Sequence, residues 1–243
     1  MDKLSYATLQ KQGYQGYLLE NAPERVLQFG EGNFLRAFVD YFFDIANETC
    51  GFNGKVVLCQ PIAQGLADMI NAQDGLYTLY LRGFEKGKKV NDKRIISSVS
   101  RCINPYDDYA ALLACAHNPD LRYLASNTTE AGIAFDDACK FDDAPPASFP
   151  AKLTRFLFER FTATHGEKGT GFVILSCELI DNNGKELQKC VHQYIDLWQL
   201  SAEFAAWVDA ENLFCSTLVD RIVTGYPRSE AAALNAEIGY EDN

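Results

Sequence analysis

The sequence predicts an α/β protein with a doubly wound, mainly parallel sheet and an inserted β-hairpin. Short apolar runs typical of buried strands alternate with segments in which apolar residues recur at the three- and four-residue spacing of a helix face. The first strand and the first helix meet at a Gly-x-Gly turn formed by Gly30 and Gly32. Only residues 77–103 depart from the alternation, because two β-rich runs there flank the polar turn EKGKK.

Residues 25–60 form the first predicted βαβ unit. A strand is predicted at residues 25–29 and a helix at residues 33–47. One apolar stripe on this helix, which we expect to be buried, consists of Phe34, Leu35, Phe38, Phe42 and Ile45. The run KVVLCQ at residues 55–60 is largely apolar and lies between Gly54 and Pro61, which is typical of a strand covered on both faces.

The alternation continues to residue 219, so we expect one main domain. Residues 77–82 and 94–103 are predicted to pair as a ribbon inserted at an edge of the parallel sheet. The proline-rich stretch at residues 141–150 is predicted to be a loop. The other predicted helices are residues 106–117, 151–162, 185–200 and 202–210, and the other predicted strands are residues 122–126, 171–177 and 214–219.

The composition argues against several classes of partner. The net charge of −11 disfavours nucleic acid and anionic membranes, since both need a basic face. We expect no transmembrane helix, because no run of about 18 apolar residues occurs, and no signal peptide, because the N-terminal stretch MDKLSYATLQKQGYQGY has no apolar core. The 8 cysteines include no C-x-x-C pair and the 3 histidines have no metal-binding spacing. We therefore expect buried free thiols, a cytoplasmic location and no metal site.

The paired glycines indicate that something approaches this turn closely. Glycine lacks Cβ and tolerates positive φ, and a helix N-terminus offers free N–H groups and a positive dipole end to a phosphate. A full dinucleotide fingerprint has a third glycine, whose position is Leu35 here. The pattern predicts nucleotide binding, with a tight turn that binds nothing as the alternative. A methyltransferase is a further alternative, although it would need an acid after the second strand, where this chain has Gln60.

Polar residues gather where the predicted strands end, at the edge where doubly wound sheets bind their ligands. These strand ends are residues 30–32, 60–61, 126–130, 177–183 and 220–221. Dinucleotide-binding domains usually place an acid after the second strand, where it binds the adenosine ribose. This chain has Gln60 there and no arginine beside it to bind a 2′-phosphate. We therefore expect NAD to bind better than NADP, by a narrow margin.

Several long motifs resemble the mannitol dehydrogenase family of polyol-specific long-chain dehydrogenases. They are FGEGNFLRAF, QDGLYT, SNTTEAGI, KFDDAP, AKLTRFLFERF, CELIDNNG and FCSTLVDRIVTGYPR, and the resemblance runs from about residue 23 to residue 240. It implies a Rossmann-like NAD-binding domain over residues 1–230 and the start of a linker at residues 231–243. It also implies NAD(H)-dependent interconversion of D-tagaturonate and D-altronate. A fructuronate or polyol dehydrogenase and a nucleotide-binding module without chemistry stay as alternatives.

The resemblance also implies which residues bind the cofactor. The family's NAD-binding stretch falls on Val26, Leu27, Gln28, Phe29, Gly30, Glu31, Gly32, Asn33, Phe34, Leu35, Arg36 and Ala37. Gln60 joins this set from its place after the second strand. Thr128, Thr129 and Glu130 resemble a second loop at the edge of the cofactor, where they would bind the ribose or the nicotinamide. The alternative for this loop is a capped helix start.

The resemblance implies fewer catalytic residues in this chain than cofactor-binding residues. Asp220 matches the family's active-site aspartate, with a helix cap or a salt bridge to Arg221 as the alternative. Leu179 stands where polyol-specific members have an oxyanion-binding asparagine. The family's Lys-x4-Asn-x2-His signature has no counterpart, because Lys86 and Asn91 are followed by Arg94. We therefore expect the sugar-acid substrate to bind between this chain and a C-terminal catalytic helical domain that it lacks.

Overall fold

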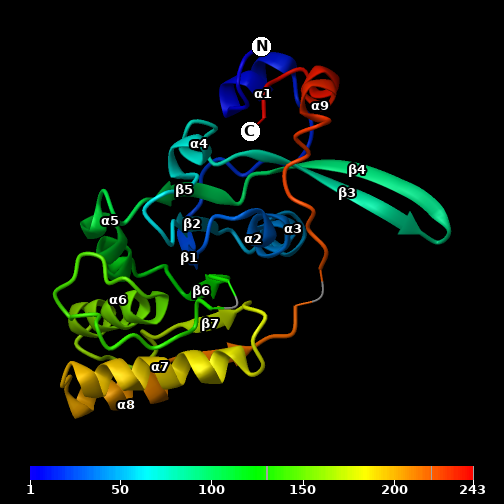
Figure 1. Cartoon of the computed structure of the whole chain (residues 1–243). Coiled ribbons are helices and arrows are strands. Elements are labelled where there is room, and N and C mark those ends of the chain that lie inside the picture. Colours follow the sequence, from blue (N-terminus) through cyan, green and yellow to red (C-terminus); the bar gives the residue numbers. More distant parts are fainter. Residues whose placement is uncertain (130, 220, 243) are drawn as a thin grey trace.

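The computed structural model of the protein describes residues 1–129, 131–219 and 221–242. Its centre is a six-stranded sheet in the order β5-β2-β1-β6-β7-β8, and every neighbouring pair is parallel (Figure 1). The strands are β1 (Glu24–Phe29), β2 (Lys55–Cys59), β5 (Val99–Ile103), β6 (Tyr123–Ser126), β7 (Val173–Ser176) and β8 (Leu213–Ser216). The predicted doubly wound fold is confirmed.

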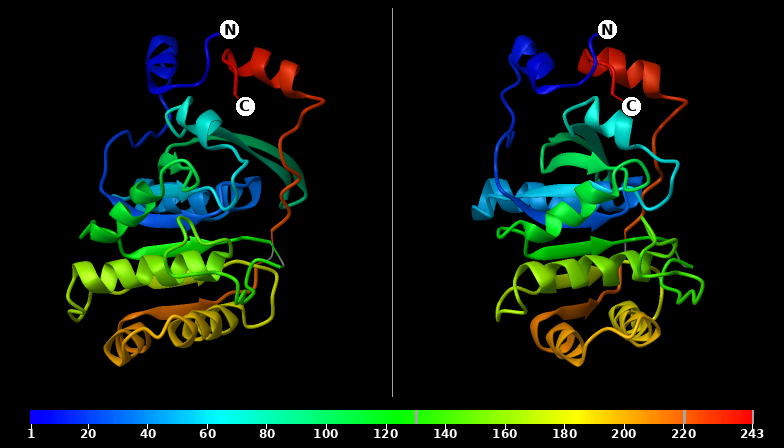
Figure 2. Two further views of the ribbon diagram at one scale, coloured as in Figure 1. Left: turned by 60° about the vertical axis from the view of Figure 1, so that its left-hand side comes forward. Right: turned by 90° about the vertical axis from the view of Figure 1, so that its left-hand side faces the viewer.

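Helices cover both faces of this sheet (Figure 2). One layer contains α2 (Asn33–Ala37), α3 (Val39–Cys50) and α4 (Ala67–Asn71), and the other contains α5 (Tyr109–Ala114), η1 (Cys115–His117), α6 (Phe149–Ala163), α7 (Asn183–Leu197) and α8 (Ala202–Glu211). Successive strand residues alternate between the layers, as the pleat requires. Leu27 and Phe29 pack in the core with α6 and α7, whereas Val26 packs with α4. The central strands β1 and β2 are therefore buried on both faces.

The predicted helix at residues 33–47 is wrong in two respects. It is broken at Phe38 (φ −123°, ψ −76°) into α2 and α3, and the expected stripe is not uniformly buried. Phe42 is 51% exposed, while Asp40 and Asp44 are fully buried. Neighbouring segments bond both of the carboxyl groups that α3 buries, although Asp40 Oδ1 has no hydrogen-bond partner among the described residues. The Ser97 backbone N–H, for example, donates to Asp44 Oδ1 at 2.8 Å.

The predicted ribbon is also divided differently. β3 (Tyr77–Glu85) and β4 (Lys88–Ile96) form a separate antiparallel pair that extends away from the parallel sheet (Figure 1). Residues 99–103, which we assigned to the ribbon, are instead β5, the edge strand beside β2. The side chain of Asn71 holds this strand, because it accepts from the Cys102 N–H and donates to the Cys102 carbonyl, both at 2.8 Å.

The two ends of the described chain lie side by side (Figures 1 and 2). Leu4 N–H donates to the Glu241 carbonyl and Glu241 N–H donates to the Asp2 carbonyl, each at 2.9 Å. α1 (Tyr6–Gln12) and α9 (Ala231–Ile238) flank this pairing, and Tyr240 packs with Leu4 in a small apolar cluster. Residues 221–230, the strap, connect the end of β8 to α9. The division into residues 1–230 and a linker stays a prediction.

The cysteines and histidines take ordinary roles. All eight cysteines are free thiols, and all except Cys50 and Cys215 are buried. His117 and His192 lie at the surface, 2.7 Å from Glu159 and 2.8 Å from Asp209 respectively. Over residues 1–129, 131–219 and 221–242, no group of histidine, cysteine and acidic residues is arranged to hold a metal. The helices of these segments are also too short or too polar to cross a membrane.

Candidate dinucleotide-binding site

The first glycine of the turn is required by its backbone. Gly30 follows β1 directly with φ +123°, a conformation that L-residues rarely adopt. A Cβ at this position would lie 3.0 Å from the carbonyl oxygen of Asn127 and 3.4 Å from the side chain of Leu35. The N–H of Gly30 donates to the Cys59 carbonyl at 2.9 Å, which ties the turn to the end of β2. Gly30 therefore lets three strand ends meet.

The second glycine faces open space. Gly32 has ordinary backbone angles (φ −67°, ψ 164°), and a Cβ built on it would meet no atom within 4 Å. It precedes α2 and makes no side-chain cap, so side chains leave the first N–H groups of that helix uncovered. The sequence pattern alone does not distinguish a ligand-binding turn from a merely tight one. The open space outside Gly32 fits the close approach of a phosphate-bearing ligand.

A buried polar network supports the turn from behind. The amide of Gln28, fully buried in β1, donates to the Gly30 carbonyl at 3.0 Å and to Asp40 Oδ2 at 3.3 Å. The hydroxyl of Tyr77 donates to the Arg36 carbonyl at 2.6 Å. Burial raises the pKa of Asp40 to about 7. The side chains of Gln28 and Asp40 therefore fix the shape of the turn and do not themselves face the cleft.

The loop after β6 lies across the switch point from the turn. β1 and β6 are neighbours, and the chain leaves them towards opposite faces, as in sheets that bind ligands at this edge. Buried Glu178, after β7, accepts from the Ser126 hydroxyl at 3.1 Å and from the N–H and hydroxyl of Thr128 at 3.2 and 3.1 Å. Burial raises the pKa of Glu178. Sequence analysis did not identify Glu178 as the residue that links these loops, although a glutamate directly after an apolar strand was the signal.

The helix-capping alternative for Thr128 and Thr129 is wrong. Both threonines lie in a loop, and the next helix of the described chain is α6, which begins at Phe149. Thr129 has φ +81°, a turn conformation and not that of an N-cap. Glu130, predicted beside them, lies outside the described residues. A cofactor role for these residues stays a prediction.

Gln60 has its side chain committed to its own loop. Its amide nitrogen donates to the Ile62 carbonyl at 2.8 Å and the Ala63 carbonyl at 3.1 Å, and its oxygen accepts from Ala67 N–H at 3.2 Å. The side chain is buried, so it shapes residues 61–67 at the end of β2. Its predicted role in cofactor binding would act through this loop.

The ends of β7 and β8 are arranged differently. The side chain of buried Asn183 donates to the Glu178 carbonyl at 2.9 Å and accepts from Thr217 N–H at 3.0 Å, so it joins these two strand ends. Leu179 is 65% exposed at their rim. Asp220, the predicted catalytic residue, lies outside the described residues. The guanidinium of Arg221 lies over aromatic rings of α3 and the helix break, 5.2 Å from the ring centre of Tyr41.

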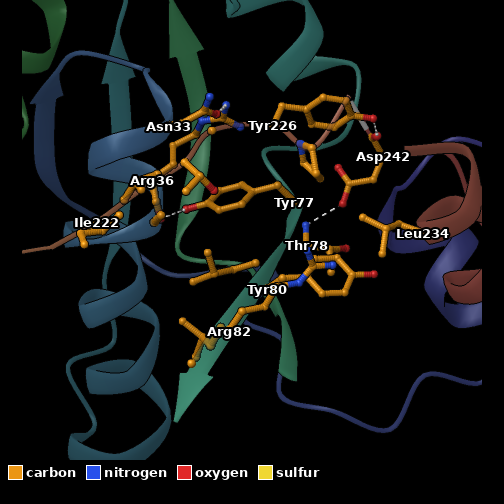
Figure 3. A pocket seen from close by; sticks show the side chains of 18 of the residues that line it. Asn33, Arg36, Tyr77, Thr78, Tyr80, Arg82, Ile222, Tyr226, Leu234 and Asp242 are labelled. Carbon is orange, nitrogen blue, oxygen red and sulfur yellow. Dashed lines mark hydrogen bonds between the residues drawn. The ribbon is translucent and has the colours of Figure 1, made fainter. Parts of the chain in front are cut away.

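A groove of about 870 Å³ opens beside the glycine turn (Figure 3). Asn33 and Arg36 form its wall on the turn side, β3 forms a second wall, and the strap and α9 close it. Asp242 reaches into it from the C-terminal end and accepts from Thr78 N–H at 2.6 Å. Sequence analysis did not predict this groove, because its walls are far apart in the sequence.

The strand order, the glycine turn and the loops at the switch point define a Rossmann-type dinucleotide-binding domain. Residues 24–243 match the family described as the mannitol dehydrogenase Rossmann domain. The chain belongs to this family, as the sequence motifs predicted.

Curated relatives in this family are bacterial. The chain is 54% identical over 221 residues to an altronate oxidoreductase of Klebsiella pneumoniae subsp. pneumoniae, covering 90% of this chain and 46% of the relative. It is 52% identical over 236 residues to an altronate oxidoreductase of Enterobacter sp. strain 638, covering 97% of this chain and 48% of the relative. The chain thus spans about half the length of the curated relatives it matches.

Solved structures show the same fold at lower identity. Mannitol 2-dehydrogenase of Pseudomonas fluorescens, in a ternary complex with NAD and D-mannitol, superposes with a TM-score of 0.80 at 22% identity, over 97% of this chain and 50% of that one. A substrate-free D-sorbitol dehydrogenase superposes with a TM-score of 0.78 at 22% identity, over 99% of this chain and 52% of that one.

Proposed function

We propose that this chain is the NAD(H)-binding part of an oxidoreductase that interconverts D-tagaturonate and D-altronate. The observation that carries the proposal is the open glycine turn at the switch point, where Gly30 is obligatory and the space outside Gly32 is free. Relatives at 52–54% identity named altronate oxidoreductase support the substrate. The solved mannitol 2-dehydrogenase complex with NAD supports the cofactor.

The chain's own residues would bind and orient the cofactor. The backbone of residues 30–33 would hold the pyrophosphate, because no side chain caps the start of α2 and the space outside Gly32 is open, while the Gly30 N–H stays bonded to the Cys59 carbonyl. The 61–67 loop would border the adenosine, and Thr128 and Thr129 would border the opposite half of the cofactor. When bound there, the nicotinamide supplies a hydride to the ketone carbon of tagaturonate.

The ketone oxygen needs a proton as the hydride arrives. No lysine of this chain has the family's Lys-x4-Asn-x2-His spacing, so we assign the general acid to a C-terminal catalytic domain, with Asp220 as a contributor from this chain. The reverse reaction, oxidation of altronate, would return this proton to the same group. We place the enzyme in the cytoplasm, where its free thiols stay reduced, with neither nucleic acid nor membrane as a partner.

A fructuronate or mannitol-type polyol dehydrogenase is the second candidate. Leu179 favours a sugar acid over a polyol, because polyol-specific members carry an asparagine at this position. The names of the relatives favour altronate over the alternatives. A nucleotide-binding module without chemistry would share the cofactor site and would be distinguished by activity.

The test is calorimetric titration of the chain with NADH. The wild type should bind, and Gly32→Val should abolish binding, because a branched side chain would occupy the space that the pyrophosphate needs. Valine tolerates the backbone angles of Gly32, so the variant should fold. Thr162→Val is the control, since it places the same side chain at an exposed position of α6 that does not line the groove beside the turn. Absence of NADH binding to the wild type would refute the proposal.

A further inference from the structure

The residue between the two glycines has an unusual environment. The side chain of Glu31 is only 7% exposed, although it stands in a turn at the edge of the sheet. Its Oε1 accepts from Leu66 N–H at 3.3 Å, in the loop that follows β2. A Cβ on Gly65 would collide with this carboxylate oxygen and with the side chain of Gln60. Glu31, Gln60 and Gly65 therefore pack together where the second strand ends.

This placement brings the carboxylate of Glu31 to the loop after β2, whose own residues include no carboxylate. Residues 60–67, QPIAQGLA, contain no charged side chain. Dinucleotide-binding domains usually have an acid here, which accepts hydrogen bonds from the adenosine ribose hydroxyls. Gln60 has its amide committed to Ile62, Ala63 and Ala67. Glu31 reaches the same loop from the glycine turn.

The carboxylate also has capacity left to bind a ligand. Within the described part of the chain, Glu31 makes no ion pair, and its Oε2 accepts no hydrogen bond. Oε2 is not among the unpaired side-chain atoms of the described residues that are sealed from solvent, so it is open to solvent at the edge of the sheet. A largely buried carboxylate with one long hydrogen bond is costly to keep, and two hydroxyl donors would satisfy it.

We propose that Glu31 binds the 2′- and 3′-hydroxyls of the adenosine ribose and makes the chain select NAD over NADP. The inference rests on the proposed function, and it moves the selecting carboxylate from the usual position after the second strand to the glycine turn. A 2′-phosphate would remove one donor and add roughly 1.5 to 2 negative charges beside a carboxylate that makes no ion pair with any described residue. Both changes disfavour NADP.

The experiment measures binding of ADP-ribose and of 2′-phospho-ADP-ribose by calorimetry, so that neither nicotinamide chemistry nor a catalytic domain is involved. Wild type should prefer ADP-ribose. Glu31→Gln should weaken the binding of ADP-ribose. It should also reduce the preference for ADP-ribose over 2′-phospho-ADP-ribose at least about tenfold, which is about 1.4 kcal/mol. Glu203→Gln, the same charge change on an exposed residue of α8, should leave the ratio unchanged.

Two further measurements keep the inference open to refutation if Glu31→Gln folds poorly. Wild type should bind 2′-deoxy-ADP-ribose about tenfold more weakly than ADP-ribose. Glu31→Asp should weaken ADP-ribose while it still rejects the 2′-phosphate, because the charge stays. An unchanged ratio in folded Glu31→Gln, or equal binding of the deoxy probe by wild type, would overturn the role of Glu31 and leave the NADH proposal standing. Binding of neither probe nor NADH by wild type would overturn both.

Discussion

The two halves of the carboxyl edge of the sheet differ in how complete they are. At the ends of β1 and β2, the side chains of Gln28, Glu31 and Gln60 are buried and hydrogen-bonded. Beyond the ends of β7 and β8, the large apolar side chains of Leu218 and Ile222 are 96% and 90% exposed. The proposed cofactor site in the first half is therefore built from buried, hydrogen-bonded side chains, whereas the second half exposes apolar side chains that the described chain does not cover.

The largest effect should appear in an assay of catalysis, because turnover needs both halves of the carboxyl edge. We expect this chain to bind NADH and to show no measurable reduction of D-tagaturonate, followed by absorbance at saturating cofactor. General acid–base catalysis alone contributes about 10²–10⁴-fold, and positioning adds more. Turnover at an ordinary enzymatic rate would show that this chain contains a working substrate site at the ends of β7 and β8. The two halves of the carboxyl edge would then not differ in the way described.

Stability should distinguish the two glycines of the first half. We expect Gly30→Ala to lower the free energy of unfolding by about 1–3 kcal/mol, because alanine is strained at φ +123° and its Cβ meets the Asn127 carbonyl. Gly32→Ala should change it by less than about 0.5 kcal/mol, since its Cβ points into open space. Urea denaturation measures both. Equal losses would mean that the turn is not built as described.

The buried network behind the turn should make stability depend on pH. The folded-state pKa of Asp40 is about 7, above the ordinary aspartate value of 3.8, so the folded chain holds a proton that the unfolded chain releases between these values. Stability attributable to Asp40 therefore falls as pH rises through this range, by up to about 1.4 kcal/mol per pH unit. We expect Asp40→Asn to become more stable relative to wild type between pH 5 and pH 7 in urea denaturation. A stability difference that does not vary with pH would contradict this.

The smallest effect should come from the second half. Leu218→Ser and Ile222→Ser should each change the free energy of unfolding by no more than about 0.5 kcal/mol, because their side chains make little contact with the rest of the chain. Leu27→Ala, in the fully buried centre of β1, should cost about 2–5 kcal/mol. Thermal and urea unfolding of the three variants would measure these losses. A loss for Leu218→Ser or Ile222→Ser as large as that for Leu27→Ala would contradict the prediction.

The sequence was sufficient wherever the signal was local. The apolar runs of β1 and β2, the glycine turn and the family motifs all lie in short contiguous stretches, and each was recognised correctly. Helix starts were predicted less well. α6 begins at Phe149 and not at residue 151, because the Ser148 hydroxyl accepts from Ala151 N–H and caps the helix earlier.

The features that escaped prediction depend on partners distant in the sequence. Asp40 and Asp44 on α3 appear misplaced until Gln28 and Ser97 are brought beside them. β5 was joined to the ribbon because its pairing with β2 leaves no mark in its own residues. The contact of Glu31 with Leu66 spans 35 residues. No periodicity in a short window contains such information.

The pairing of the two chain ends has a consequence for the order of assembly. α1 shares its apolar cluster with Tyr240, and the Leu4 N–H donates to the carbonyl of Glu241, so the first helix is held by residues that are synthesised after all six strands of the parallel sheet. On a ribosome that synthesises about 5–20 residues per second, α1 would wait for more than ten seconds while the βαβ units form around it. We therefore expect α1 to dock only after the parallel sheet and the nucleotide cleft at its edge have taken shape.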